Sequence, residues 1–262
     1  MTALTLSVAR DLDAWRRLRP RRGTLGFVPT MGALHDGHLS LVRRALAEND
    51  ACVVSIFVNP TQFDDATDLA AYPKTFDDDC ALLAGLGEPL VLAPAADAMY
   101  ADGYRVRVSE QIDALELEGE HRPGHFDGML TVVLKLLNIA RADRAYFGEK
   151  DFQQLRLVRT MVESLFHPTK IVGCATVRER DGLAMSSRNR RLNSAQRALA
   201  GRWAALLADT SLPADEAARR LAALGFTVDY VADRWGRRLG AVHVPTVDGG
   251  PEVRLIDNVA LP

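Results

Sequence analysis

The chain has 262 residues, of which 48% are hydrophobic and 25% are charged, and its formal net charge is −2. This length and apolar content suffice for one large domain, or for one domain with a small second one. The near-neutral charge argues against a general nucleic-acid-binding protein, and no apolar stretch approaches the length of a membrane span.

Cysteine usage and the N-terminus both favour a cytoplasmic protein. The three cysteines Cys52, Cys80 and Cys174 are scattered, without the paired spacing of a metal site or a disulfide framework. Since Cys52 and Cys174 lie in apolar runs, we expect reduced thiols in the core. Acidic residues accompany the arginines near the N-terminus, which favours a helix at 11–18 over a targeting peptide.

The first two-thirds of the chain alternates short apolar runs with longer segments of helical periodicity. The expected strands are 26–29, 52–58, 90–93, 145–147 and 171–176, and the expected helices are 39–47, 77–86, 129–140 and 152–165. The run at 52–58 is almost wholly apolar, as in a strand covered on both faces. This alternation predicts an α/β fold with a parallel sheet, in which ligands bind at the carboxyl ends of the strands.

The pattern changes after about residue 177. Two helices rich in Ala and Arg are expected at 194–208 and 214–224, and three short strands at 227–231, 241–244 and 253–256, with a short connection at 235–241. Strands without intervening helices indicate an antiparallel α+β piece. We therefore expect two domains, at 1–176 and 177–262.

His35 and His38 are the first candidate site residues, because they follow an apolar run and a turn and begin a helical segment. Backbone N–H groups at a helix start are unsatisfied donors that suit phosphate. The two imidazoles lie one turn apart, so both can reach the same phosphate. Asp36 between them is a candidate N-cap. Two surface histidines flanking a cap are an equal alternative from this tetrapeptide alone.

Amide side chains follow the expected strand at 52–58. Asn59 and Gln62 offer uncharged donors and acceptors at the carboxyl end of that strand, which suit a small ligand with hydroxyl and carboxylate groups. An Asn-Pro turn with a solvated glutamine is the alternative.

Cationic side chains follow the last two expected strands of the parallel sheet. Gly148 permits close backbone approach, and Lys150 offers a point charge to phosphate. The adjacent hydroxyls of Ser186 and Ser187, followed by Arg188, suit a polyphosphate through charge-assisted hydrogen bonds. An ordinary β-to-α turn and a solvated arginine-rich linker are the alternatives.

Two further segments have features that occur in ligand-binding sites. Gly and Pro residues in 118–128 predict a mobile loop of the kind that covers an active site. The acidic run at 77–79 suits Mg²⁺ bound through water, and it equally suits the first turn of a helix.

Seven segments carry a resemblance to a known family, namely PTMGALHDGH, SIFVNPTQF, YPKTFDDD, RPGHFDGM, YFGEKDFQQL, DGLAMSSRN and RLIDN. They are spread from residue 29 to residue 258, and together they make the chain resemble the pantoate–β-alanine ligases. HDGH alone indicates only the broader nucleotidyltransferase superfamily, in which a His-x-Gly-His motif pairs with a later basic signature, here Met185 to Arg188.

The resemblance implies a Rossmann-like N-terminal catalytic domain, a small α+β C-terminal lid domain and a homodimer. It implies dependence on Mg²⁺ and ATP, and a reaction that joins (R)-pantoate to β-alanine through a pantoyl-adenylate, releasing pyrophosphate and AMP. Small molecules are the implied partners, with no nucleic acid and no membrane. The alternative is an adenylyltransferase of the same superfamily that acts on a phosphorylated acceptor and lacks the paired glutamines Gln62 and Gln154.

The resemblance also carries site residues onto matching positions. The implied ATP site consists of Met31, Gly32, Ala33, Leu34, His35, Asp36, Gly37, His38, Gly148, Glu149, Lys150, Asp151, Val177, Met185, Ser186, Ser187 and Arg188. Within it, His38 matches the catalytic histidine, and we expect His35, Lys150 and Arg188 to join it in offsetting charge on the phosphates. The expected substrate-binding residues are Gln62, Gln154 and Asn59, and Asp78 and Asp79 match the acidic pair near the metal.

Overall fold

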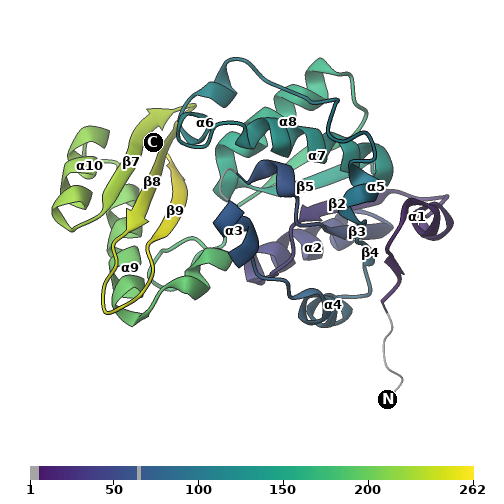
Figure 1. Ribbon diagram of the computed structural model, residues 1–262, viewed down its shortest axis with the longest axis horizontal. Coiled ribbons are helices and arrows are strands. Elements are labelled where there is room, and N and C mark those ends of the chain that lie inside the picture. Colours follow the sequence, from purple (N-terminus) through teal and green to yellow (C-terminus); the bar gives the residue numbers. More distant parts are fainter. Residues whose placement is uncertain (1–5, 64–65) are drawn as a thin grey trace. The chain divides into compact units, whose positions relative to one another are not determined.

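The computed structural model describes residues 6–63 and 66–262. The chain forms two compact units (Figure 1). Unit 1 comprises Met1–Gly148 and Gln153–Cys174, and unit 2 comprises Glu149–Phe152 and Ala175–Pro262. Across the described residues, no helix has both the length and the apolar character needed to cross a membrane.

Unit 1 is built on a six-stranded parallel sheet with the strand order β1-β4-β3-β2-β5-β6. Its strands are β1 (Val8–Ala9), β2 (Leu25–Thr30), β3 (Ala51–Ile56), β4 (Leu90–Leu92), β5 (Arg144–Gly148) and β6 (Lys170–Cys174). Its helices are α1 (Leu12–Leu18), α2 (Asp36–Glu48), α3 (Ala66–Ala71), α4 (Phe76–Ala84), α5 (Ala96–Met99), α6 (Glu118–His121), α7 (His125–Ala140) and α8 (Phe152–Ser164), with 3-10 turns at η1 (Pro60–Gln62) and η2 (Asp113–Leu115). The expected α/β fold is confirmed.

Both faces of the parallel sheet are covered by helices. Phe27 and Val53 pack with residues of α1, α7 and α8, whereas Val28 and Val54 pack with residues of α2 and α4 (Figure 1). All four side chains are fully buried. Successive residues of a strand face opposite sides, so a strand covered on both sides is apolar at every position. This explains the continuous apolar run in β3.

The order of the strands reverses between β2 and β5. The chain passes from β2 to β3 and β4 on one side, and it later adds β5 and β6 on the other. Open parallel sheets bind ligands beside such a reversal, at the carboxyl ends of the strands. The loop at 31–35, between β2 and α2, begins at this place.

Unit 2 contains a three-stranded antiparallel sheet with the order β7-β8-β9. Its elements are η3 (Glu149–Asp151), η4 (Ser187–Arg191), α9 (Ser194–Ala208), α10 (Ala214–Ala223), β7 (Thr227–Arg234), β8 (Arg237–Val244) and β9 (Val253–Ala260). Trp203 of α9 and Leu221 of α10 pack in one buried cluster with Val242 of β8 and Leu255 of β9. The expected antiparallel α+β piece is therefore present.

The observed boundaries differ from the predicted ones at helix N-termini, at one turn and at two strand ends. Strands β3 and β6 end at Ile56 and Cys174, two residues before their predicted ends, and the short elements β1, α3, α5 and α6 were not predicted. Helix α2 begins at Asp36 rather than Leu39, and α7 begins at His125 rather than Met129, because their polar first turns lack apolar periodicity. The connection between β7 and β8 is only Trp235 and Gly236, with φ of 53° and 71°. Two positive φ angles are typical of a type I′ hairpin turn, and β7 and β8 are correspondingly longer than predicted.

Candidate functional site

The two histidines of the HDGH segment lie together at the start of α2. Their ring centroids are 4.1 Å apart. His35 is the N-cap, since its Nδ1 accepts a hydrogen bond from Gly37 N at 3.2 Å. The expected cap, Asp36, is instead the first helical residue, where its charge complements the positive end of the helix. A ring nitrogen that accepts carries no proton, so neutral His35 carries its proton on Nε2.

The loop before these histidines is held by the carboxylate of Asp79. Asp79 Oδ2 accepts from Ala33 N at 3.0 Å, and Oδ1 accepts from Leu34 N at 2.7 Å. Thr75 Oγ1 donates to Asp79 Oδ2 at 3.2 Å, and the Asp79 residue is only 1% exposed. Ala33 has a φ of 51°, a conformation that costs free energy in a non-glycine residue. The carboxylate therefore stabilises a strained turn.

Asp78 and Asp79, the acidic pair expected near a metal, therefore lie in different environments. Asp78 is exposed, whereas both oxygens of Asp79 accept hydrogen bonds from the protein. Within residues 6–63 and 66–262, no group of three or more His, Cys, Asp or Glu side chains is placed to hold a metal ion. Ligation of Mg²⁺ by this pair stays a prediction.

Asn59 is the N-cap of the short turn η1 after β3, and Gln62 is the last residue of that turn. Asn59 Nδ2 donates to Gln62 Oε1 at 3.0 Å and to Gly128 O at 3.2 Å, while Tyr100 OH donates to Asn59 Oδ1 at 2.5 Å. Burial raises the pKa of Tyr100, which favours the protonated hydroxyl. Gln62 Nε2 lies 3.2 Å from Met31 Sδ. Asn59, only 1% exposed, therefore orients Gln62 beside the loop that carries the histidines.

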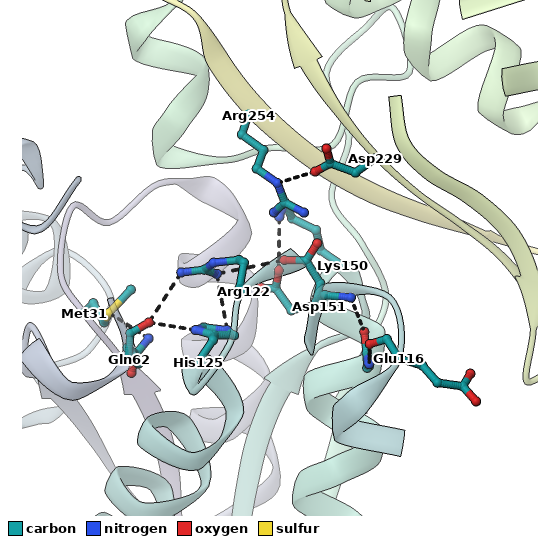
Figure 2. A network of polar contacts seen from close by, with 11 residues as sticks. Met31, Gln62, Glu116, Arg122, His125, Lys150, Asp151, Asp229 and Arg254 are labelled. Carbon is teal, nitrogen blue, oxygen red and sulfur yellow. Dashed lines mark hydrogen bonds and ion pairs between the residues drawn. The ribbon is translucent and has the colours of Figure 1, made fainter. Parts of the chain in front are cut away.

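Two side chains that were not among the predicted site residues hold the backbone of Gln62 (Figure 2). His125 Nδ1 lies 2.8 Å from Gln62 O, and Arg122 Nη2 donates to the same oxygen at 3.4 Å. A carbonyl oxygen only accepts, so His125 Nδ1 carries the proton, and its Nε2 accepts from Arg122 Nη1 at 3.3 Å. Both residues lie in the RPGHF motif, which was the sequence feature that could have pointed to them. The segment expected to be a mobile loop is instead α6 and the first turn of α7, anchored to η1.

Two adjacent glutamines, Gln153 and Gln154, lie at the start of α8, and Gln153, which was not a predicted site residue, is buried. Gln153 Nε2 donates to Asp113 O at 2.7 Å and to Glu116 O at 2.8 Å, and its Oε1 accepts from Glu118 N at 3.2 Å. Gln153 therefore fastens the segment before α7 to α8. Gln154, the predicted pantoate ligand, is partly exposed.

In unit 2, the turn that carries Lys150 is attached to strand β9. Asn258 Nδ2 donates to Glu149 O at 2.9 Å and to Lys150 O at 2.8 Å. Lys150 Nζ lies 3.2 Å from Asp151 Oδ1. Asp151 is the last residue of the 3-10 turn η3 and directly precedes α8.

The other cationic segment of unit 2 is a hairpin followed by a 3-10 turn. Met185 N donates to Val177 O at 3.0 Å, which brings these two predicted ATP-site positions together. Ser186 Oγ caps η4 by accepting from Arg188 N at 3.3 Å. Ser187 and Arg188 lie in this turn, and their contact with a polyphosphate stays a prediction.

The predicted ATP-binding residues thus divide between the two units. Residues 31–38 and 148 belong to unit 1, and residues 149–151, 177 and 185–188 belong to unit 2. Unit 1 brings Met31 and the histidine loop together with Gln62, and unit 2 brings Lys150 together with β9. The roles that sequence reasoning missed are those of Asp79, Arg122, His125, Gln153 and Asn258, each of which lies in one of the quoted motifs.

Comparison with known proteins identifies the family. The model of the Pantoate-beta-alanine ligase family matches residues 5–260. A pantothenate synthetase from Bdellovibrio bacteriovorus is 50% identical over 251 residues, covering 96% of both chains. One from Legionella pneumophila (strain Lens) is 44% identical over 259 residues, covering 98% of this chain and 100% of the relative. The crystal structure of a pantoate-beta-alanine ligase from Francisella tularensis, complexed with beta-gamma ATP and beta-alanine, has a TM-score of 0.90, 38% identity and 98% coverage of both chains.

Proposed function

The chain belongs to the pantoate–β-alanine ligase family, and we propose that it condenses (R)-pantoate with β-alanine at the expense of ATP. The match runs over residues 5–260, so it includes every motif that bears a candidate site residue. The observation that carries the proposal is the arrangement in unit 1, where paired histidines start a helix at the carboxyl end of β2, and Gln62 lies beside the same loop.

The reaction proceeds in two steps. In the first, a carboxylate oxygen of pantoate attacks the α-phosphorus of ATP, and the bond to the β-phosphate breaks, so that pyrophosphate leaves and pantoyl-adenylate forms. In the second, the neutral amine of β-alanine attacks the acyl carbon. AMP leaves, and the nitrogen loses one proton as the amide forms.

The protein's part in the first step is electrostatic. Negative charge shifts onto the leaving pyrophosphate, and His35, His38, Lys150 and Arg188 offset it with N–H donors and positive charge. No covalent enzyme intermediate is required. The hydroxyl of Ser186 serves to cap η4, which agrees with a role in shaping the turn rather than as a nucleophile.

Pantoate is held by Gln62 and Gln154, and Gln62 also lies near β-alanine. Side-chain amides both donate and accept, so they match the hydroxyl and carboxylate groups of pantoate. Asn59 fixes the Gln62 amide through the 3.0 Å contact between Asn59 Nδ2 and Gln62 Oε1. Contact between Asn59 and the substrate itself is a further part of this proposal.

Mg²⁺ enters as a partner of the ATP phosphates. The ion keeps several waters and commonly needs only one or two carboxylates besides the phosphates. The described residues fit that mode rather than a protein-held site, since they contain no cluster of three or more suitable side chains and Asp79 is engaged with the loop. Asp78, which is exposed, is the member of the acidic pair left to approach such an ion.

The proposal includes three further features that follow from the family. The protein is a homodimer, it works in the cytoplasm, and its C-terminal part from residue 177 acts as a lid that excludes water from the adenylate. Exclusion of water is chemically necessary, because a mixed anhydride hydrolyses.

The experiment that tests the function is substrate omission. Purified protein is incubated with Mg-ATP, pantoate and β-alanine, and each is left out in turn. AMP and pyrophosphate should require pantoate, and the amide should require all three. The His38→Ala variant should lose roughly two to three orders of magnitude in kcat while it keeps the wild-type melting temperature. Transfer of AMP to a phosphorylated acceptor, with no amide formed, would overturn the proposal.

A further inference from the structure

The RLIDN motif at 254–258 has no role in the chemistry above, yet its last two residues are buried and polar. Asp257 is 3% exposed and Asn258 is 1% exposed. A buried polar side chain costs free energy unless its hydrogen bonds are made. The contacts of these two residues therefore indicate what the motif does.

Every polar atom of the Asn258 side chain has a partner in unit 2. Its Nδ2 donates to the carbonyl oxygens of Glu149 and Lys150, at 2.9 and 2.8 Å, and its Oδ1 accepts from Arg237 Nε. Carbonyls only accept and a guanidinium only donates, so the orientation of the amide is fixed by its surroundings. No other arrangement of this amide satisfies all three partners.

The neighbours of Asn258 reinforce the same turn. Arg237 lies over the Phe152 ring at 4.7 Å and forms an ion pair with Glu149 at 3.6 Å. Arg178 binds both oxygens of Asp257, at 2.6 and 3.1 Å, and donates to Asn258 O at 3.0 Å. Residues 149–152 are thus held by β8 and β9, which explains why they belong to unit 2 although the sequence on either side belongs to unit 1.

We propose that Asn258 is a positioning residue for Lys150. Asn258 holds the carbonyl oxygens of Glu149 and Lys150, and it thereby fixes the backbone of the turn from which the Lys150 side chain extends. The inference rests on the proposed function, in which Lys150 offsets charge on the ATP phosphates. A single 3-10 turn is marginal alone, and the lysine stem has four rotatable carbons. The backbone is therefore the part that can be fixed, and a displacement of about 1 Å can cost roughly a hundredfold in rate.

The test compares Asn258→Ala with Asn193→Ala, a matched control in the same unit. Asn193, which is partly exposed, donates from Nδ2 to Val247 O at 2.6 Å and accepts at Oδ1 from Gln196 N at 2.9 Å, so both substitutions delete a side-chain amide that bridges two segments. Asn258→Ala should lower kcat by about 10- to 100-fold with the KM for pantoate unchanged. Asn193→Ala should lower only the melting temperature. Asn258→Asp should be worse than alanine, because it turns an acceptor toward two carbonyls.

A double-mutant cycle separates positioning from general damage. In a Lys150→Ala background, adding Asn258→Ala should change kcat by less than about threefold, because the group that Asn258 positions is already gone. Independent effects that multiply, or an Asn258→Ala variant with the wild-type rate, would overturn the inference.

Hydrogen–deuterium exchange gives a reading that does not depend on the reaction. Backbone amides in the peptide over 149–152 should exchange faster in Asn258→Ala and at the wild-type rate in Asn193→Ala. If the wild-type protein makes no pantoate-dependent AMP, the proposed function fails, and the exchange measurement still tests the positioning. An unchanged exchange rate over 149–152 in Asn258→Ala would refute it in either case.

Discussion

At the scale of single residues, Asp79 shows how far a sequence pattern can determine a role. Three consecutive aspartates suggested either a metal site or the acidic first turn of a helix. The carboxylate instead accepts from the backbone of Ala33 and Leu34, and Leu34 lies 45 positions earlier in the chain. Nothing local in the sequence encodes that contact, because it depends on how α4 packs beside the loop after β2.

Because Asp79 holds the loop that begins the predicted ATP site, its loss should weaken ATP binding. In an Asp79→Asn variant, only one atom can accept, so at least one loop N–H loses its partner inside the protein. Such a loss costs about 1–3 kcal/mol. We expect a lower melting temperature and a KM for ATP raised roughly tenfold or more, measured by steady-state kinetics with pantoate saturating. The exposed neighbour provides the control for stability, since Asp78→Asn should leave the melting temperature near wild type.

The same pair of variants distinguishes loop anchoring from metal binding. If the two carboxylates hold Mg²⁺, both substitutions should raise the Mg²⁺ concentration needed for half-maximal rate, and excess Mg²⁺ should restore activity. If Asp79 anchors the loop, the Asp79→Asn variant should need the same Mg²⁺ concentration for half-maximal rate as the wild-type protein. Recovery of Asp79→Asn by added Mg²⁺ would contradict the anchoring role.

At the scale of elements, the central strands were predictable and the first turn of α7 was not. The apolar run of β3 follows directly from burial on both faces of the sheet, whereas Gly124, His125 and Asp127 read as a loop. That stretch is helical because tertiary contacts select it, with His125 hydrogen-bonded to η1 and Gly128 packed against it. Periodicity carries no information about such contacts.

Gly128 sets how closely α7 approaches η1. A Cβ atom there would lie 2.1 Å from Thr61 O and 2.8 Å from Gln62 Cα, and both are backbone atoms. Alanine normally favours a helix over glycine by about 1 kcal/mol. Here the clash prevails, so we expect Gly128→Ala to destabilise the protein by roughly 1–3 kcal/mol. The displaced Gln62 should raise the KM for pantoate more than the KM for ATP.

The matched control is a glycine with room for a side chain. Gly85 has a φ of −74°, and the nearest atom to its added Cβ is Leu82 O at 3.5 Å. Gly85→Ala should therefore be neutral or slightly stabilising in a denaturant titration, with both KM values unchanged. Equal effects of the two alanines on stability would show that close packing at Gly128 is not the cause.

At the scale of the whole molecule, the two kinds of sheet were predictable, and the strand order was not. Alternating strands and helices indicate parallel pairing, and consecutive strands indicate antiparallel pairing. The order β1-β4-β3-β2-β5-β6 depends on pairings between distant segments. For the same reason, the attachment of residues 149–152 to β9 was not apparent, although both segments lie in motifs that the resemblance singled out.

Both units contain carboxylates whose pKa values are lowered by hydrogen bonds in the folded chain. In unit 1, the Val106 backbone N–H and then Lys135 lower the pKa of Asp102 to about 2. In unit 2, the hydrogen bond from Arg197 lowers the pKa of Asp181. A carboxyl group with a lowered folded pKa stabilises the protein above its unfolded pKa, near 4, and loses that contribution as pH falls through its folded pKa.

We therefore expect the melting temperature to fall as pH drops from about 4 to about 2, measured by circular dichroism across a pH series. Asp102→Asn should have a lower melting temperature than wild type at pH 7, because it loses the charge that faces Lys135. Near pH 2 the wild-type carboxyl is itself half protonated, so the difference between the two proteins should shrink there. A difference that stays constant down to pH 2 would mean that the ionised form of Asp102 adds nothing to stability, against the network that ties it to Val106 and Lys135.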